Sequence, residues 1–148
     1  MNVRPARVTD AKTIAHLTQG LCEHHGDTSS LTAETIASLI DQAGFLTFAT
    51  CGDPVVGYVA YYRVTQLHAQ EFGLYVHHLY VEPDARGQGI GQKLMTYVEQ
   101  QALAGGMTYV QVSADPDNQM ASAYLSMDYE ESPPNTARRF LKNLKSHP

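Results

Sequence analysis

The alternation of apolar and polar positions divides the chain into short helical and extended runs. Ile14, Leu17 and Leu21 recur at helical spacing after Asp10, which predicts a helix capped by that aspartate. A second helix is predicted over residues 32–43. Runs rich in β-branched and aromatic residues predict strands over residues 3–8, 45–50, 55–64, 74–81, 107–114 and 138–144, with further helices over residues 90–104 and 118–127. The resulting order, βααββ followed by βαβαβ, predicts a mixed α/β layer.

Local signals at the turns refine this order. Pro5 predicts an edge position or a bulge in the first strand, because proline cannot donate to a strand ladder. Thr32 is predicted to cap the second helix, and Gly44 to end it. The segment Cys-Gly-Asp-Pro at residues 51–54 separates two extended runs and predicts an antiparallel hairpin.

Composition indicates one globular domain over residues 1–148. Of the 148 residues, 43% are hydrophobic, which is enough to bury a core, and Cys22 and Cys51 form no disulfide framework. No apolar run approaches the roughly 20 residues of a membrane span, and the N-terminus lacks the apolar stretch of a signal peptide. We therefore expect a cytoplasmic protein with no membrane partner. A net charge of −5 argues against a nucleic-acid ligand.

The most informative motif is Arg86-Gly-Gln-Gly-Ile-Gly91, which lies between a predicted strand and a predicted helix. At such a junction the amides of the loop and of the helix N-terminus converge, and they form a site for phosphate. Glycine lets the backbone approach a bulky anion, and an arginine adds a two-pronged cationic contact. The motif predicts binding of a phosphate ligand, although a solvent-exposed turn would also contain glycines.

Two common nucleotide loops fit the motif less well. Gln92 and Lys93 follow Gly91 where a P-loop needs lysine and a hydroxyl residue. The spacing Gly-x-Gly-x-Gly differs from the dinucleotide fingerprint Gly-x-Gly-x-x-Gly, and the loop does not follow the first strand. Asp115 lies at a plausible distance for a ribose contact, so a nucleotide-binding α/β protein stays open as an alternative.

The segment from Leu79 through Gly91 resembles the coenzyme A pyrophosphate loop of the GNAT N-acetyltransferase superfamily. The resemblance extends over most of the chain and implies a GNAT-like, mostly antiparallel sheet with helices on both faces, splayed to admit the pantetheine arm. It implies acetyl-CoA as cosubstrate, contacted by Leu79, Val81, Arg86, Gly87, Gln88, Gly89, Ile90, Gly91 and Asn118. Homodimers are plausible for this superfamily, so a homodimer is a further expectation.

Candidates for acid and base follow from the same resemblance. Tyr124 stands where a GNAT tyrosine points at the sulfur of coenzyme A; a core tyrosine is the alternative. Asn118 lies six residues before Tyr124 where seven is usual, so Asp117 competes for that position. Asp128 replaces the family's glycine at the helix end, a position that aspartate tolerates.

His77 occupies the place where many GNAT enzymes have a glutamate. We expect it to accept the ammonium proton, directly or through water, since an ordinary imidazole is largely neutral at physiological pH. A packed or surface histidine is the alternative. His77 and His78 are neighbours in a predicted strand, so their side chains should point to opposite faces. The chain's cysteines and histidines have no recognised ligand spacing, and no metal is expected.

These expectations combine into an N-acetyltransferase that moves an acetyl group from acetyl-CoA to a primary amine in a ternary complex. The acceptor would be a small cationic amine or a peptide amine; Glu23, Asp27 and Glu71 could attract a polyamine, and the chain is weakly similar to diamine acetyltransferases. A non-catalytic acyl-CoA sensor is the main alternative, because the family's glutamate is absent.

Overall fold

A computed structural model describes residues 1–24, 26, 30–42, 44–114, 120–132, 140 and 142–146; of His24 and Ser146 it describes the backbone alone. The chain divides into two compact units, Met1–Ser113 and Ala114–Pro148, which are described separately. Among the described residues no helix is long and apolar enough to cross a membrane.

The first unit is built on one five-stranded sheet in the order β1-β2-β3-β4-β5. Its strands are β1 (Val3–Pro5), β2 (Thr47–Cys51), β3 (Gly57–Gln66), β4 (Glu71–Val81) and β5 (Tyr109–Val112). The first four strands pair antiparallel, while β4 and β5 pair parallel. The predicted mixed, mostly antiparallel sheet is confirmed. Pro5 lies on an edge strand, as predicted, because β1 pairs with β2 alone among the described strands.

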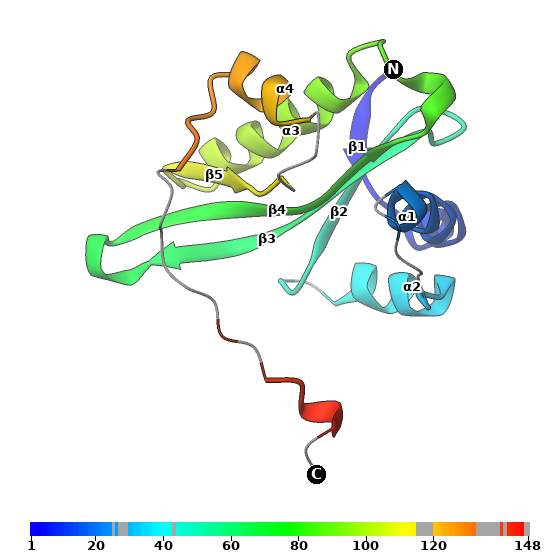
Figure 1. The fold of residues 1–148 in the computed structure, drawn as a ribbon, viewed down its shortest axis with the longest axis horizontal. Coiled ribbons are helices and arrows are strands. Elements are labelled where there is room, and N and C mark those ends of the chain that lie inside the picture. The colour runs from blue at the N-terminus through cyan, green and yellow to red at the C-terminus, as the bar shows by residue number, and fades with distance from the viewer. Residues whose placement is uncertain are drawn as a thin grey trace. The chain divides into compact units, whose positions relative to one another are not determined.

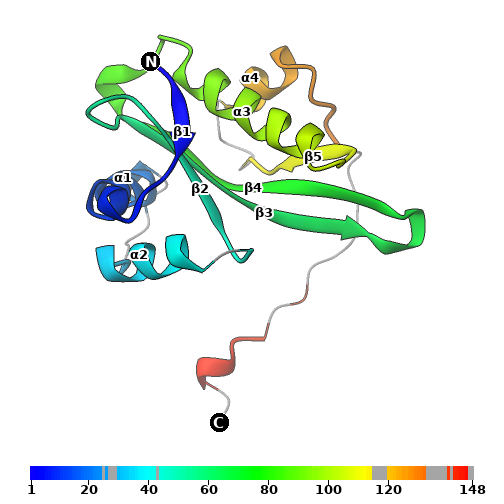
Figure 2. The same ribbon diagram turned by 180° about the vertical axis from the view of Figure 1, so that it is seen from behind.

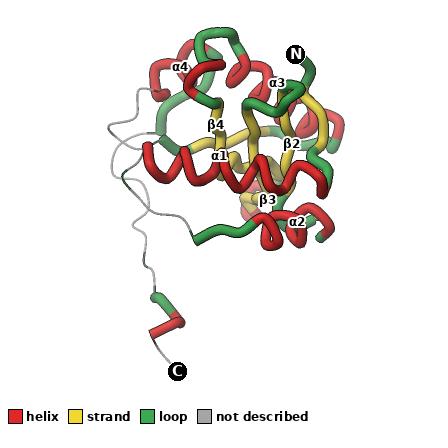
Figure 3. The backbone as a smooth tube through the Cα atoms, turned by 90° about the vertical axis from the view of Figure 1, so that its right-hand side faces the viewer, coloured by secondary structure: helices red, strands yellow, loops and turns green. Residues whose placement is uncertain are grey.

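Helices cover both faces of this sheet (Figure 1). Helices α1 (Ala11–His24) and α2 (Ala33–Asp41) pack on one face, and α3 (Ile90–Ala104) packs on the other. The opposite view shows the same two layers around the sheet (Figure 2). Seen end-on, α1 lies across the strands (Figure 3). The predicted N-cap of α2 is confirmed, because the Thr32 side chain accepts a hydrogen bond from the Thr35 amide. The predicted end is wrong: the helix stops at Asp41 with Gln42 as its C-cap, before Gly44.

Two apolar cores follow from this layering. Toward α1 and α2 the core contains Ala11, Ile14, Leu17, Ile36, Phe48, Tyr58, Ala60 and Tyr80. Toward α3, the buried face of that helix consists of Ile90, Leu94, Met95, Val98 and Ala102. A Cβ on Gly57 of β3 would lie 3.2 Å from Ile90 and 3.4 Å from Leu94, so glycine lets α3 approach the sheet closely at the end nearest the glycine loop.

The second unit contains α4 (Met120–Ser126) and a short 3₁₀ turn at Leu144–Ser146. Asp128 follows α4 with a positive φ of 67°, so the residue that replaces the family's glycine adopts the expected left-handed conformation. The strand predicted over residues 138–144 is wrong for the residues described there: Phe140, Lys142 and Asn143 lie in no helix or strand, and Leu144 begins the 3₁₀ turn. Residues 138, 139 and 141 lie outside the described residues.

Candidate active site

The glycine loop leaves the end of β4 and leads into α3. Gly87 and Gly89 have positive φ angles of 79° and 78°, which explains the need for glycine at both positions. Gly89 is the N-cap of α3, and in the described structure no side chain caps this helix. The first backbone bond of the helix runs from the Lys93 amide to the Gly89 oxygen, at 3.0 Å. The amides of Ile90, Gly91 and Gln92 therefore have no acceptor within the helix, and an anion can take that place.

Space for such an anion exists on the outside of the loop. A Cβ added to Gly87, Gly89 or Gly91 would meet no described atom within 4 Å. At Gly91 the backbone does not require glycine, because its φ lies outside the left-handed range. The absence of a side chain there is thus not explained by internal packing, and it fits a close approach of backbone to ligand.

Arg86 braces the loop against the end of β4. Its Nε donates a hydrogen bond of 2.9 Å to the Val81 carbonyl oxygen, and its guanidinium lies 5.2 Å from the centroid of the Tyr80 ring. A Cβ on Gly20 of α1 would lie 2.8 Å from the Tyr80 hydroxyl, so the same ring also packs closely on α1. This arrangement uses Nε for structure, so a phosphate bound by Arg86 would accept hydrogen bonds from the terminal guanidinium nitrogens.

An open edge of β4 lies beside the loop. The ladder between β4 and β5 ends at Val76 and Val112, and beyond Val76 the described residues of β4 pair with β3 alone. The Glu82 amide donates to Val56 of the neighbouring chain segment, at 2.7 Å. Because backbone groups alternate sides along a strand, the amides of Leu79 and Val81 point the other way, toward the open edge. These two amides thus lie on the side of β4 where the resemblance implies that the sheet is splayed.

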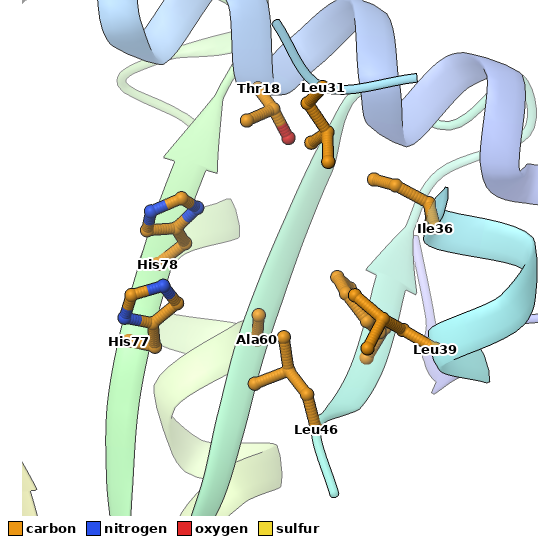
Figure 4. A pocket seen from close by; sticks show the side chains of 9 residues that line it. Thr18, Leu31, Ile36, Leu39, Leu46, Ala60, His77 and His78 are labelled. Carbon is orange, nitrogen blue, oxygen red and sulfur yellow. The ribbon is translucent and has the colours of Figure 1, made fainter. Parts of the chain in front are cut away.

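The histidine pair lies at a β-bulge in β4. The register moves from Ala60 opposite His78 to Tyr61 opposite Val76, so His77 is one extra residue in its strand. The two imidazole rings stack with centroids 4.2 Å apart and an interplanar angle of 10°. Figure 4 shows both rings projecting from β4 toward α1 and α2. The expectation that the rings point to opposite faces is wrong, because the bulge breaks the alternation of the strand.

A hydrogen-bond chain fixes the orientation of His78. Thr18 Oγ1 donates to the Ile14 carbonyl oxygen at 2.8 Å, and it lies 2.8 Å from the Tyr58 hydroxyl. Since the only hydroxyl hydrogen of Thr18 goes to that carbonyl, Tyr58 must be the donor to Thr18. Tyr58 Oη then accepts from His78 Nδ1, 3.3 Å away. Neutral His78 therefore carries its proton on Nδ1 and its lone pair on Nε2.

Tyr58 is suited to hold this arrangement. It is fully buried, and burial raises the pKa of its phenol well above the usual value. The phenol consequently keeps its proton at physiological pH and remains a donor to Thr18. Thr18 and Tyr58 were missed in the sequence, where the only signal was a polar Thr18 within the apolar stripe of the first helix, one turn after Ile14.

The remaining predicted acid and cofactor-binding residues belong to the second unit. Tyr124 lies on α4, in the second unit, where its ring makes an edge contact with Tyr129 at 6.1 Å between centroids. Burial raises the pKa of Tyr124, so its phenol is protonated at neutral pH. Asn118, its competitor Asp117, and Asp115 lie outside the described residues. No group of three or more metal-ligating side chains occurs in the described part of the chain.

Comparison with solved structures gives the same fold. The chain is similar to a possible acetyltransferase from Clostridium difficile 630, with 19% identity, a TM-score of 0.77, and coverage of 96% of this chain and 98% of the other. It is also similar to an aminoglycoside acetyltransferase, meta-AAC0020, from an uncultured soil metagenomic sample, in complex with sisomicin: 18% identity, TM-score 0.75, coverage 96% and 95%. A third is the ribosomal-protein-alanine N-acetyltransferase from Brucella melitensis biovar Abortus 2308, with 17% identity, TM-score 0.72, and coverage of 96% and 99%.

Sequence comparison settles the family. No curated protein matches the chain. The model of the acetyltransferase (GNAT) family matches residues 13–129, which is most of the chain and includes the bulge and the glycine loop. The resemblance seen in residues 79–91 is thereby confirmed, together with the GNAT-like fold. The chain belongs to the acetyltransferase (GNAT) family.

Proposed function

We propose that residues 1–148 act as one N-acetyltransferase domain that transfers an acetyl group from acetyl-CoA to a primary amine. The observation that carries the proposal is the N-terminus of α3, which no described side chain caps, beside an edge of β4 that has no strand partner in the described part of the chain. The diphosphate of the cosubstrate would accept hydrogen bonds from the loop amides of residues 87–91 and from Arg86. Asn118 or Asp117 would contact its arm.

In the proposed reaction the two substrates react directly. The amine nitrogen attacks the thioester carbonyl, a carbon–nitrogen bond forms, and the carbon–sulfur bond breaks with departure of the thiolate. The amides of Leu79 and Val81, which point to the open edge, are the donors that would stabilise the carbonyl oxygen as negative charge develops. Holding both substrates in one cleft supplies much of the rate enhancement.

Proton transfer is assigned to the histidines of the bulge and to Tyr124. The amine must lose its proton before attack, and His77 is the base predicted from the sequence. The hydrogen bonds of His78 favour His78 as the better oriented of the pair, because its lone pair is fixed on Nε2. Tyr124 would hydrogen-bond to the leaving sulfur and protonate it. Its raised pKa makes the phenol a weaker acid than a thiol, so the hydrogen bond is its first contribution.

The decisive experiment is a calorimetric titration with acetyl-CoA followed by thiol release over a panel of amines. We expect binding of acetyl-CoA and release of free thiol only when an amine is present. Binding without amine-dependent release would instead support the acyl-CoA sensor. Absence of binding to well-folded protein, together with a rise in melting temperature on adding NAD or ATP, would favour a nucleotide-binding protein.

A homodimer that resides in the cytoplasm completes the proposal, without bound metal, membrane or nucleic-acid partner. Sedimentation at micromolar concentration tests the dimer directly.

A further inference from the structure

A cavity of about 150 Å³ opens beside the histidine pair, between the sheet and the two N-terminal helices. Six of its described lining residues are aliphatic or aromatic: Leu31, Ile36, Leu39, Leu46, Phe48 and Ala60. The polar members of the lining are Thr18, His77 and His78. Figure 4 shows the imidazole rings on one side and the leucines on the other, facing each other across the space.

The polar and apolar parts of this cavity would contact different parts of an acceptor amine. Thr18 is buried, and its hydroxyl is engaged with Ile14 and Tyr58, so it orients His78 from beneath. The imidazoles mark the end where an amine nitrogen would be deprotonated. The opposite wall includes the apolar side chains of Leu31, Leu39 and Leu46, which are all partly buried. Such a wall gains free energy from an apolar group and offers no partner to a second ammonium.

The volume of the cavity limits which acceptor amines it can hold. An apolar cavity of roughly 150 Å³ is large enough for one benzene ring. A single phenyl or branched aliphatic group therefore fills the space, whereas a multi-ring amine exceeds it.

The acidic residues that suggested a polyamine do not line this cavity among the described residues. Glu71 begins β4, seven residues before His78, which corresponds to about 23 Å along an extended strand. It pairs with Gln66 at the far end of the β3–β4 hairpin. Asp27 lies outside the described residues, and Glu23 is an exposed residue near the end of α1.

We propose that the acceptor is a primary amine bearing one compact apolar group, which enters this cavity and leaves the amine nitrogen at the His77–His78 pair. This inference rests on the proposed acetyl transfer and specifies its substrate class. The continuity of the site along β4 supports it: the bulge and the edge at Leu79 and Val81 lie on this strand, and the glycine loop follows its end.

The test compares benzylamine, methylamine and 1,4-diaminobutane as acceptors with saturating acetyl-CoA. We expect kcat/KM for benzylamine to exceed that for either other amine by about tenfold, since an apolar group of this size fills a matching pocket. Leu46→Phe, which fills the cavity, should lower kcat/KM about tenfold more for benzylamine than for methylamine. Leu103→Phe is the matched control, because Leu103 is a 75% exposed leucine on α3, on the other face of the sheet.

A binding measurement separates failure of this inference from failure of the proposed function. Benzylamine is titrated into the acetyl-CoA-bound protein while the ring resonances of His77 and His78 are followed. Thiol release that is fastest with 1,4-diaminobutane, or unaffected by Leu46→Phe, overturns the apolar acceptor while acetyl transfer stands. Another outcome is that benzylamine shifts the histidine resonances saturably, Leu46→Phe abolishes these shifts, and no amine is acetylated. That outcome supports the apolar binding pocket and overturns the proposed acetyl transfer. If the histidine resonances do not shift and benzylamine is not the preferred acceptor, the inference is overturned.

Discussion

At the scale of single residues, the candidate site depends on which nitrogen of the His78 ring carries the proton, and residues that do not touch the ring determine this. The Thr18 hydroxyl lies two hydrogen bonds away from the His78 ring, yet it decides which imidazole nitrogen is protonated. Tyr58 transmits this choice because its phenol has a single hydrogen to donate. The buried chain therefore acts on the site without touching a substrate, and Thr18 and Tyr58 are positioning residues.

The first prediction tests that chain. In Thr18→Val the Tyr58 hydroxyl loses its acceptor and donates to His78 Nδ1 instead, which moves the imidazole proton to Nε2. We expect ¹⁵N chemical shifts of His78 to report this tautomer change, and kcat to fall about 100-fold with little change in the KM for acetyl-CoA, the size expected for loss of a general base. Thr18→Ser keeps the hydroxyl and should resemble the wild type. An unchanged tautomer in Thr18→Val would contradict the assignment.

The second prediction concerns Thr50, a fully buried residue of β2. Its hydroxyl oxygen has no hydrogen-bond partner among the described residues. Burying an unpaired hydroxyl costs about 1–3 kcal/mol, whereas valine has the same shape without that group. Thr50→Val should therefore raise the free energy of unfolding by about 1 kcal/mol in urea denaturation. The neighbouring Cys51→Ser, which adds a buried hydroxyl, should lower it.

At the scale of elements, the junction of β4 and α3 combines strand geometry with helix-end chemistry. The loop must turn sharply at Gly87 and Gly89, whose positive φ angles penalise any side chain. Gly91 is different, because a Cβ there meets nothing and its φ requires no glycine. Helix formation thus favours alanine at position 91, whereas the proposed binding of a phosphate at the backbone favours glycine.

The third prediction follows from that opposition. Gly91→Ala should leave the melting temperature unchanged or raise it, since alanine is the better helix former by up to about 1 kcal/mol. The same methyl group stands beside the amides that would bind the diphosphate, and we expect affinity for coenzyme A to fall about tenfold, or about 1.4 kcal/mol, by calorimetry. Gln101→Ala, near the other end of α3, is the control. Equal affinity in both variants would argue against a diphosphate at the loop.

Much of this element order was predictable from sequence, and the exceptions have a physical cause. Hydrophobic spacing identified α1, α2 and α3, and the turn at residues 51–54 identified the β2–β3 hairpin. The predicted role of Asp10 as the cap of α1 was wrong, because Asp10 ends a 3₁₀ turn and its carboxylate accepts from Arg4 and the Arg7 amide. The start of β4 was missed, because Glu71, Phe72 and Gly73 lack the alternating pattern. Gly73 is explained only by its partner strand: a Cβ there would lie 2.6 Å from the Tyr109 ring.

The candidate site was predictable only where it depends on local sequence. The loop of residues 86–91 is contiguous, so its role could be inferred from spacing. The histidine pair depends on a register shift between β3 and β4, and strand alternation by itself gives the opposite answer. The hydrogen bond between Thr18 and Tyr58 joins residues that are 40 positions apart in the sequence, and it forms only when α1 packs on β3.

At the scale of the whole molecule, the edge strand needs its own attachment, because β1 has three residues and pairs with β2 alone among the described strands. Arg4 of β1 provides it through two hydrogen bonds, of 2.7 and 3.0 Å, to the Asp10 carboxylate just before α1. The Arg7 amide donates a third bond of 2.7 Å to the same carboxylate. This cluster connects the first strand to the first helix, on the face that carries the proposed acceptor cavity.

The fourth prediction is a dependence of global stability on acid. The hydrogen bonds from the Arg4 guanidinium lower the pKa of Asp10, with a further contribution from the Arg7 amide and against the cost of burial. A carboxyl group with a depressed folded-state pKa stabilises the protein above its unfolded pKa of about 3.9, and this contribution is lost as the pH falls through the lower, folded-state value.

Asp10→Asn should therefore reduce the free energy of unfolding by about 2 kcal/mol at pH 7, the scale of charge-assisted hydrogen bonds. Urea denaturation from pH 7 to pH 2 should show the two proteins converging below pH 4, whereas Glu71→Gln, an exposed change at the start of β4, should keep the acid dependence of the wild type. A difference between Asp10→Asn and wild type that stays constant down to pH 2 would mean that the Asp10 charge does not hold β1 to α1.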